Sequence, residues 1–158
     1  MKAAHVDRAT APKAATALGI AGLVPFVALA FQVATGWPLG ARSTGPALYA
    51  LQIYGAVILS FLGGVHWGLA ASHDGDDVQQ DWRRFGAAVT PALVAWAALF
   101  LLSPQHSLYA LAVTLAMLHL YERTIAHQDL PRWLMRLRFG LTSIAAASLV
   151  VAAGLGPF

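Results

Sequence analysis

Long apolar segments alternate with short polar ones along this chain. Five segments are long and apolar enough to cross a hydrocarbon core of about 30 Å as helices that rise about 1.5 Å per residue. They cover, approximately, residues 14–34, 47–71, 85–102, 107–125 and 137–155. The pattern predicts an all-α, polytopic integral membrane protein with five transmembrane helices. We expect one domain over residues 14–158, preceded by a polar arm over residues 1–13.

Turn-forming and polar residues separate the five segments. Glycine and proline crowd residues 35–46, and a proline lies in the third and in the fourth connection, as is typical of turns. Pro25 predicts a kink in the first segment, because proline removes a helix hydrogen bond. A cleaved signal peptide is the alternative for that segment, but its apolar run is longer than the usual signal core.

The basic residues are distributed unevenly between the two ends of the predicted helices. Only Arg42 falls in a connection on one side of the membrane. The other side has Lys2, Arg8, Lys13, Arg83, Arg84, Arg123, Arg132, Arg136 and Arg138. Because lysine and arginine accumulate in cytoplasmic loops, the sequence predicts a cytoplasmic N-terminus and a C-terminus outside.

The composition supports a membrane protein and excludes several other classes. The chain is 58% hydrophobic and 11% charged, against about 25% charged residues in soluble domains. It has no cysteine, which excludes disulfides, thiolate metal sites and cysteine nucleophiles. The net charge of +3 is explained by the loop arginines, so we predict the lipid bilayer, and no nucleic acid, as partner.

The second segment carries a stripe of small residues. Ala56, Ser60, Gly64 and Gly68 recur every four residues, with Gly63 beside them. Small residues at this spacing let two helix backbones approach closely in a membrane. We expect these residues to pack against other helices of the same chain. The alternative is contact with a second copy or with a larger membrane protein complex.

Ionisable residues lie inside the apolar segments at similar depths on the predicted cytoplasmic side. His66 is in the second segment, off the small-residue stripe, and Glu122 is in the fourth. Ionisable residues at such depth are a functional-site hypothesis by default. The candidate ligand or lipid site comprises Tyr54, His66, Arg84, His119, Glu122, Arg123 and Arg138.

Four kinds of chemistry fit these residues. The favoured one is a buried network in which His66 and His119 hydrogen-bond across helices and Glu122 pairs with Arg123, Arg84 or Arg138 near the interface. The alternatives are a quinone or other lipid headgroup site, a proton-linked site that uses histidine titration, and haem or metal ligation by the two histidines. No catalytic or metal-ligating motif is present, so we predict neither a catalytic residue nor a cofactor.

The run from Tyr54 to Gly68, YGAVILSFLGGVHWG, resembles the signature of a family of small multi-span membrane proteins of unknown function. This is domain-of-unknown-function family 3429, the transmembrane protein sixty-nine-like proteins. Further similar pieces are Thr90-Pro91 followed by Trp96, and Trp133 followed by Leu137-Arg138 and Leu141-Thr142. The resemblance implies an integral inner-membrane protein, with no activity to carry over.

The resemblance also bears on the candidate site. Members of the family have an acidic residue with basic partners near the end of the fourth span, where this chain has Glu122 and Arg123. The position of His66 varies among them, with a basic residue as an alternative. The resemblance therefore favours a positive charge or a hydrogen-bond donor at His66 over a haem or metal ligand.

These observations predict a non-enzymatic protein of the bacterial inner membrane. We expect an accessory or assembly subunit that acts by helix packing, with lipid binding as an additional role. Two alternatives belong to other classes: a quinone- or haem-linked redox subunit, and a small-solute or proton transporter.

Overall fold

The computed structural model describes residues 10–72, 78–125 and 130–156. This part of the chain forms five long helices and one short 3-10 turn. They are α1 (Thr10–Thr35), η1 (Ala41–Ser43), α2 (Thr44–Ala71), α3 (Val78–Leu101), α4 (Pro104–Thr124) and α5 (Arg132–Leu155). The predicted all-α class is confirmed.

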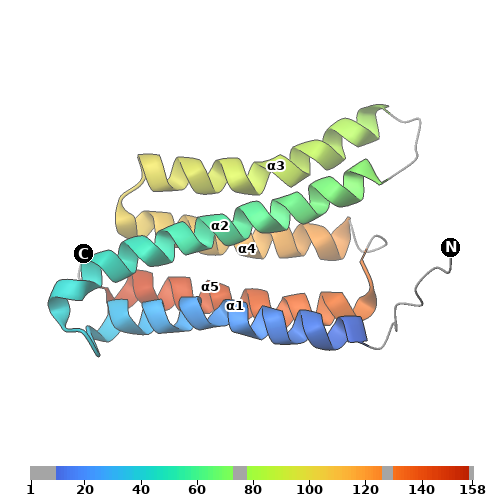
Figure 1. Cartoon of the computed structure of the whole chain (residues 1–158). Helices are drawn as coiled ribbons and strands as arrows, with labels where there is room; N and C mark the ends of the chain where they lie inside the picture. The colour runs from blue at the N-terminus through green and yellow to red at the C-terminus, as the bar shows by residue number, and fades with distance from the viewer. Residues whose placement is uncertain (1–9, 73–77, 126–129, 157–158) are drawn as a thin grey trace, which may run out of the picture.

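Consecutive helices run in opposite directions and lie side by side (Figure 1). The helix α1 packs against α2 and α5, α3 packs against α2 and α4, and α4 also packs against α5. Contact between α2 and α4 closes the interior of this ring. The two helices that carry His66 and Glu122 are therefore direct neighbours.

One end of the bundle carries most of the described cations, and we call it the basic end. There α1, α3 and α5 begin and α2 and α4 end (Figure 1). Its described lysines and arginines are Lys13, Arg83, Arg84, Arg123, Arg132, Arg136 and Arg138. Arg42, in η1, lies at the opposite end. Lys2 and Arg8 of the predicted arm lie outside the described residues.

The helices are longer than the apolar segments that predicted them. Both α3 and α5 begin several residues earlier than expected, at Val78 and Arg132. Hydropathy marks only the stretch that matches the hydrocarbon core, whereas a helix continues until its backbone hydrogen bonds find other partners. Pro104 starts α4 at its first turn, where the missing N–H of proline has no consequence.

Four helices, α1, α2, α3 and α5, are long and apolar enough to cross a membrane. Among the described residues α4 does not meet this criterion, because polar side chains interrupt it. Three of those polar side chains are buried, namely Ser107, His119 and Glu122, whereas His106 and Arg123, near the two ends of α4, are exposed. The outer face of α4 is apolar and exposed, with Val113, Met117 and Leu120.

The core draws buried side chains from all five helices, including Phe26 of α1 and Ala95 of α3. Its largest fully buried residues include Leu51, Leu59, Leu108, Leu111 and Leu149. Alanines on the buried faces of α3 and α5 let the helices approach, as small residues do in membrane bundles. Many large apolar side chains point outward instead, among them Leu18, Phe31, Trp96 and Phe100, which suits a lipid environment.

The small residues of α2 divide between an inner and an outer surface. Gly63 is buried, and a Cβ there would collide with the carbonyl oxygen of Ala88 on α3. Ser60, Gly64 and Gly68 are exposed, and a Cβ at either glycine would meet nothing within 4 Å. Ala56 is only partly buried, against the core. The expected packing of Ser60, Gly64 and Gly68 within the chain is therefore wrong, because that helix face points away from the bundle.

Candidate functional site

A fully buried carboxylate, Glu122, joins three helices near the basic end. Its side chain is 0% exposed. His66 of α2 donates from Nε2 to Oε1 of Glu122 over 2.9 Å. Arg138 of α5 donates from Nε to Oε2 over 2.7 Å, and its Nη2 lies 2.6 Å from Oε1. We call these three residues the Glu122 cluster.

Charge and hydrogen bonding are matched within the Glu122 cluster. The two nitrogens of Arg138 grip both oxygens of the carboxylate, the strong two-pronged geometry of arginine–carboxylate pairs. The Arg138 side chain is itself 11% exposed, so both charges are largely removed from solvent. A buried charge of this kind is stable only when it is paired and hydrogen-bonded. The cluster therefore fixes how α2, α4 and α5 pack.

His119 lies one turn before Glu122 on α4 and, unlike the residues of the Glu122 cluster, is a buried polar side chain without a hydrogen-bond partner among the described residues. Its Nδ1 lies 3.5 Å from Oε2 of Glu122, at the limit for contact. Neither ring nitrogen has a hydrogen-bond partner among the described residues, although His119 is only 8% exposed. Its ring packs against Phe139 of α5 at a centroid distance of 5.7 Å. Buried polar atoms usually have partners, so this side chain calls for an explanation.

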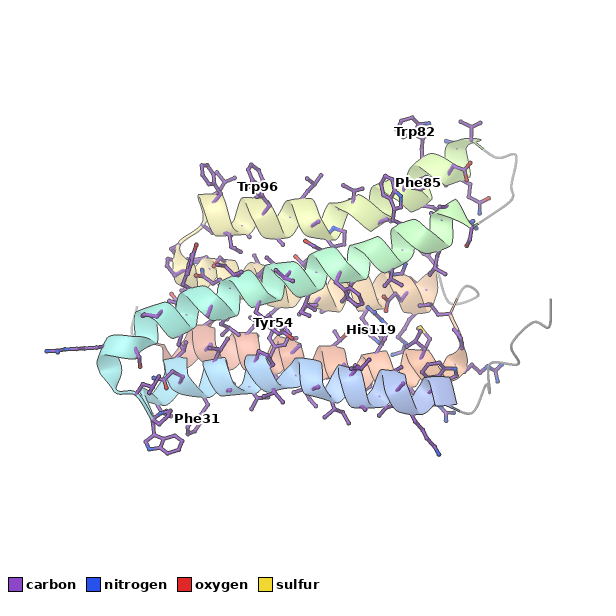
Figure 2. All side chains as sticks on the ribbon, viewed as in Figure 1. Phe31, Tyr54, Trp82, Phe85, Trp96 and His119 are labelled. Atoms are coloured by element: carbon purple, nitrogen blue, oxygen red, sulfur yellow. The ribbon has the colours of Figure 1, made fainter. Side chains whose placement is uncertain are left out.

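A pocket of about 410 Å³ opens beside His119. It lies between the last turns of α4 and the first turns of α5, where His119 points between the two ribbons (Figure 2). Its lining residues are His119, Arg123, Met135, Arg136 and Phe139. The pocket thus combines two guanidinium groups, one imidazole and two apolar side chains.

Tyr54 belongs to another part of the bundle. It lies twelve residues before His66 on α2, which is about 18 Å along a helix. Its hydroxyl donates to the carbonyl oxygen of Gly22 on α1 over 2.8 Å, between the two helices in Figure 2. Its ring also meets Phe26 edge-on at 5.0 Å. Tyr54 therefore anchors α1 to α2.

The structure brings together four of the seven predicted site residues: His66, His119, Glu122 and Arg138. Among the described residues, no ion pair joins Arg84 or Arg123 to Glu122, and Arg123 instead lines the pocket. Of the two histidines expected to hydrogen-bond across helices, His66 does so, to Glu122, whereas His119 has no hydrogen-bond partner in the described part of the chain.

Sequence reasoning missed three residues of the pocket: Met135, Arg136 and Phe139. Phe139 follows Arg136 by three residues and Met135 by four, and residues at these separations are neighbours on one helix surface. That spacing was available as a signal. The sequence does not show, however, that this surface meets the end of α4.

Comparison with known proteins places the chain in a family. The family model described as "Protein of unknown function (DUF3429)" matches residues 11–154. Transmembrane protein 69 of Xenopus tropicalis is 36% identical over 144 residues, which cover 89% of this chain and 53% of that protein. Transmembrane protein 69 of Mus musculus is 30% identical over 142 residues, which cover 89% of this chain and 55% of that protein.

The chain spans about half the length of the curated relatives it matches. No solved structure matches it. The family suggested by the run from Tyr54 to Gly68 is confirmed by the match over most of the chain. The chain is a multi-pass membrane protein that belongs to the DUF3429 family of proteins of unknown function, and it is homologous to Transmembrane protein 69.

Proposed function

We propose that this protein spans the bacterial inner membrane five times, with α4 as the fourth span and the N-terminus in the cytoplasm. The arrangement of α4 supports this proposal: it runs alongside the other helices (Figure 1), with Val113, Met117 and Leu120 outward and the polar Ser107, His119 and Glu122 buried. The described cations gather at the basic end, which would face the cytoplasm under the positive-inside rule.

We further propose that the protein is a non-enzymatic accessory or assembly subunit that binds another membrane protein through α2. The observation that carries this proposal is the outer surface of α2, formed by Ser60, Gly64 and Gly68. All three are exposed, and a Cβ at Gly64 or Gly68 would meet nothing within 4 Å. Nothing in the described bundle covers this surface.

The physical reason is that helices in lipid gain little from apolar burial and associate mainly through close packing. The outer residues Ser60, Gly64 and Gly68 of α2 are small, and Val57, Phe61 and Trp67 are larger exposed side chains of the same helix. Inside the bundle, Gly63 already lets α3 approach α2 closely. The outer surface has the same chemistry and would accept a helix of a second protein.

The absence of cysteine allows a direct test by cross-linking. Gly64→Cys introduces one thiol on the outer surface of α2, and Phe100→Cys places one on the exposed face of α3 as the matched control. In native membranes we expect a cross-linked product for Gly64→Cys and none for Phe100→Cys. A product of twice the chain mass identifies a second copy, and any other mass identifies a different partner.

A bulky variant completes this test. Gly64→Leu fills the outer surface without touching the bundle, so it should abolish recovery of the partner while the protein still folds and inserts. If neither the cross-link nor the effect of Gly64→Leu were seen, the accessory role through α2 would be refuted.

Neither alternative function gains support from the geometry. Ligation of one haem by both histidines would require a ring nitrogen from each to face the iron, but Nε2 of His66 is hydrogen-bonded to Glu122. Proton-linked transport through Glu122 would require a carboxylate that exchanges partners, whereas both oxygens of Glu122 are held by Arg138.

A further inference from the structure

The pocket beside His119 is separate from the Glu122 cluster and has a different charge. In the cluster, Arg138 and Glu122 offset each other. No carboxylate of the described residues lies within 4.0 Å of the guanidinium of Arg123 or Arg136, and both line the pocket. The pocket therefore carries two cations that no described acidic side chain pairs with.

His119 supplies the second, independent indication that the pocket holds a ligand. Its side chain is 10% exposed, lines the pocket and leaves both ring nitrogens without a hydrogen bond among the described residues. Leaving a buried polar group unpaired is unfavourable. An acceptor atom inside the pocket would remove this penalty. The side chain is thus poised for a hydrogen bond that the protein alone does not provide.

We propose that this pocket binds the phosphate of an anionic lipid headgroup. Phosphate presents several acceptor oxygens in the geometry that guanidinium groups recognise, so Arg123 and Arg136 would hold two sides of it. The imidazole of His119 would donate to a third oxygen. The volume of about 410 Å³ lies in the range of about 300–1,000 Å³ typical of small-ligand sites.

The position and the remaining lining residues favour a lipid as the source of that phosphate. Arg123 lies in the last turn of α4 and Arg136 in the second turn of α5, both at the basic end, where a helix meets the headgroup layer. Phe139 is one turn deeper on α5 and is exposed, and it would contact the glycerol and upper acyl chain. Basic pockets between spanning helices are a known setting for headgroup binding.

The residues that line the pocket belong to α4 and α5, whereas the proposed partner surface belongs to α2. Residues that the sequence grouped into one candidate site therefore have separate roles. Arg138 and His66 hold the buried carboxylate, whereas His119, Arg123 and Arg136 face the ligand.

Native mass spectrometry of the full chain in a neutral detergent tests the proposal. Phosphatidylglycerol and phosphatidylcholine are titrated separately into the wild type and two double variants. Arg123→Gln/Arg136→Gln removes the two cations of the pocket. Arg83→Gln/Arg84→Gln is the matched control, because it removes the same charge at the same end of the bundle from α3.

We expect the wild type to bind phosphatidylglycerol in preference to phosphatidylcholine. At about fivefold per arginine, Arg123→Gln/Arg136→Gln should weaken phosphatidylglycerol binding by about 25-fold, while Arg83→Gln/Arg84→Gln should retain most of it. Equal losses in the two double variants, or a wild type without headgroup preference, would overturn the proposal, since both results indicate unspecific attraction between charges.

His119→Phe tests the imidazole by itself, because phenylalanine preserves the ring and removes the nitrogens. We expect weaker phosphatidylglycerol binding together with equal or higher thermal stability in phosphatidylcholine. Unchanged affinity for phosphatidylglycerol would refute the role of His119.

Inorganic phosphate, added to a sample that contains only phosphatidylcholine, distinguishes the two sources of the anion. If phosphate binds and then competes with phosphatidylglycerol in an Arg123- and Arg136-dependent way, the phosphate chemistry is supported and the lipid source is overturned. Absence of such competition supports the lipid.

Discussion

The sharpest test of the fold is to remove the guanidinium that neutralises Glu122. Arg138→Met keeps a long apolar side chain in place and deletes the two contacts of 2.7 Å and 2.6 Å to the carboxylate. Glu122, which is 0% exposed, then retains the hydrogen bond from His66 and the longer approach of His119 Nδ1 at 3.5 Å. A buried carboxylate is left with its charge uncompensated.

The expected loss follows from that burial. Breaking a buried ion pair by removing one partner destabilises a protein by about 3–5 kcal/mol, because the remaining charge stays out of water. For a chain of this size each kcal/mol corresponds to roughly 2–4 °C in Tm. We therefore expect Arg138→Met to lower the Tm by about 6–20 °C.

The measurement is thermal unfolding of the purified protein in a mild detergent, followed by fluorescence of its five tryptophans. The double variant Glu122→Gln/Arg138→Met is the control, because it removes both charges and leaves an amide that His66 can still reach. Replacing both members of a buried pair is often close to neutral. The double variant should therefore recover most of the lost Tm.

Two outcomes would refute this reasoning. A Tm of Arg138→Met equal to that of the wild type would mean that the pair contributes nothing or that water reaches Glu122. A double variant as unstable as the single one would mean that Arg138 acts through packing of its side chain and not through charge.

Two further predictions concern packing and orientation. Gly63→Ala should lower the Tm by an amount equivalent to about 1–3 kcal/mol, because the new Cβ meets the Ala88 carbonyl. Gly64→Ala should leave the Tm unchanged or raise it. Equal effects of the two variants on the Tm would contradict the assignment of inner and outer surfaces. A membrane-impermeant maleimide should label Arg42→Cys in intact cells and Arg83→Cys only after lysis; the reverse pattern would overturn the proposed orientation.

Much of the fold could be predicted because lipid leaves a chain few options. Backbone groups in the hydrocarbon core must be satisfied within each segment, so a long apolar segment has to be helical. Helix number and approximate position follow from hydropathy and from turn residues such as Pro104. The depth of His66 and Glu122 follows as well, since each helix advances by a constant rise per residue. Which residues are helical could therefore be predicted along most of the chain, apart from the polar first turns of α3 and α5.

The partner of Glu122 was not predictable, because depth does not fix the direction in which a side chain points. Arg123 is adjacent in sequence, but successive residues of a helix with 3.6 residues per turn point about 100° apart. Glu122 faces α2 and α5, where it meets His66 and Arg138, while Arg123 turns toward the pocket. The rotation of each helix about its own axis is set by the packing of all five.

Gly63 and Gly64 show the same division most clearly. Composition and spacing are local properties, so they were enough to predict that α2 is a helix long and apolar enough to cross a membrane, with small residues available for close packing. That Gly63 lies against Ala88 while Gly64 and Gly68 face outward became visible in the folded bundle. The physical reason is that a repeat every four residues defines a helix face but does not state which neighbour, if any, that face meets.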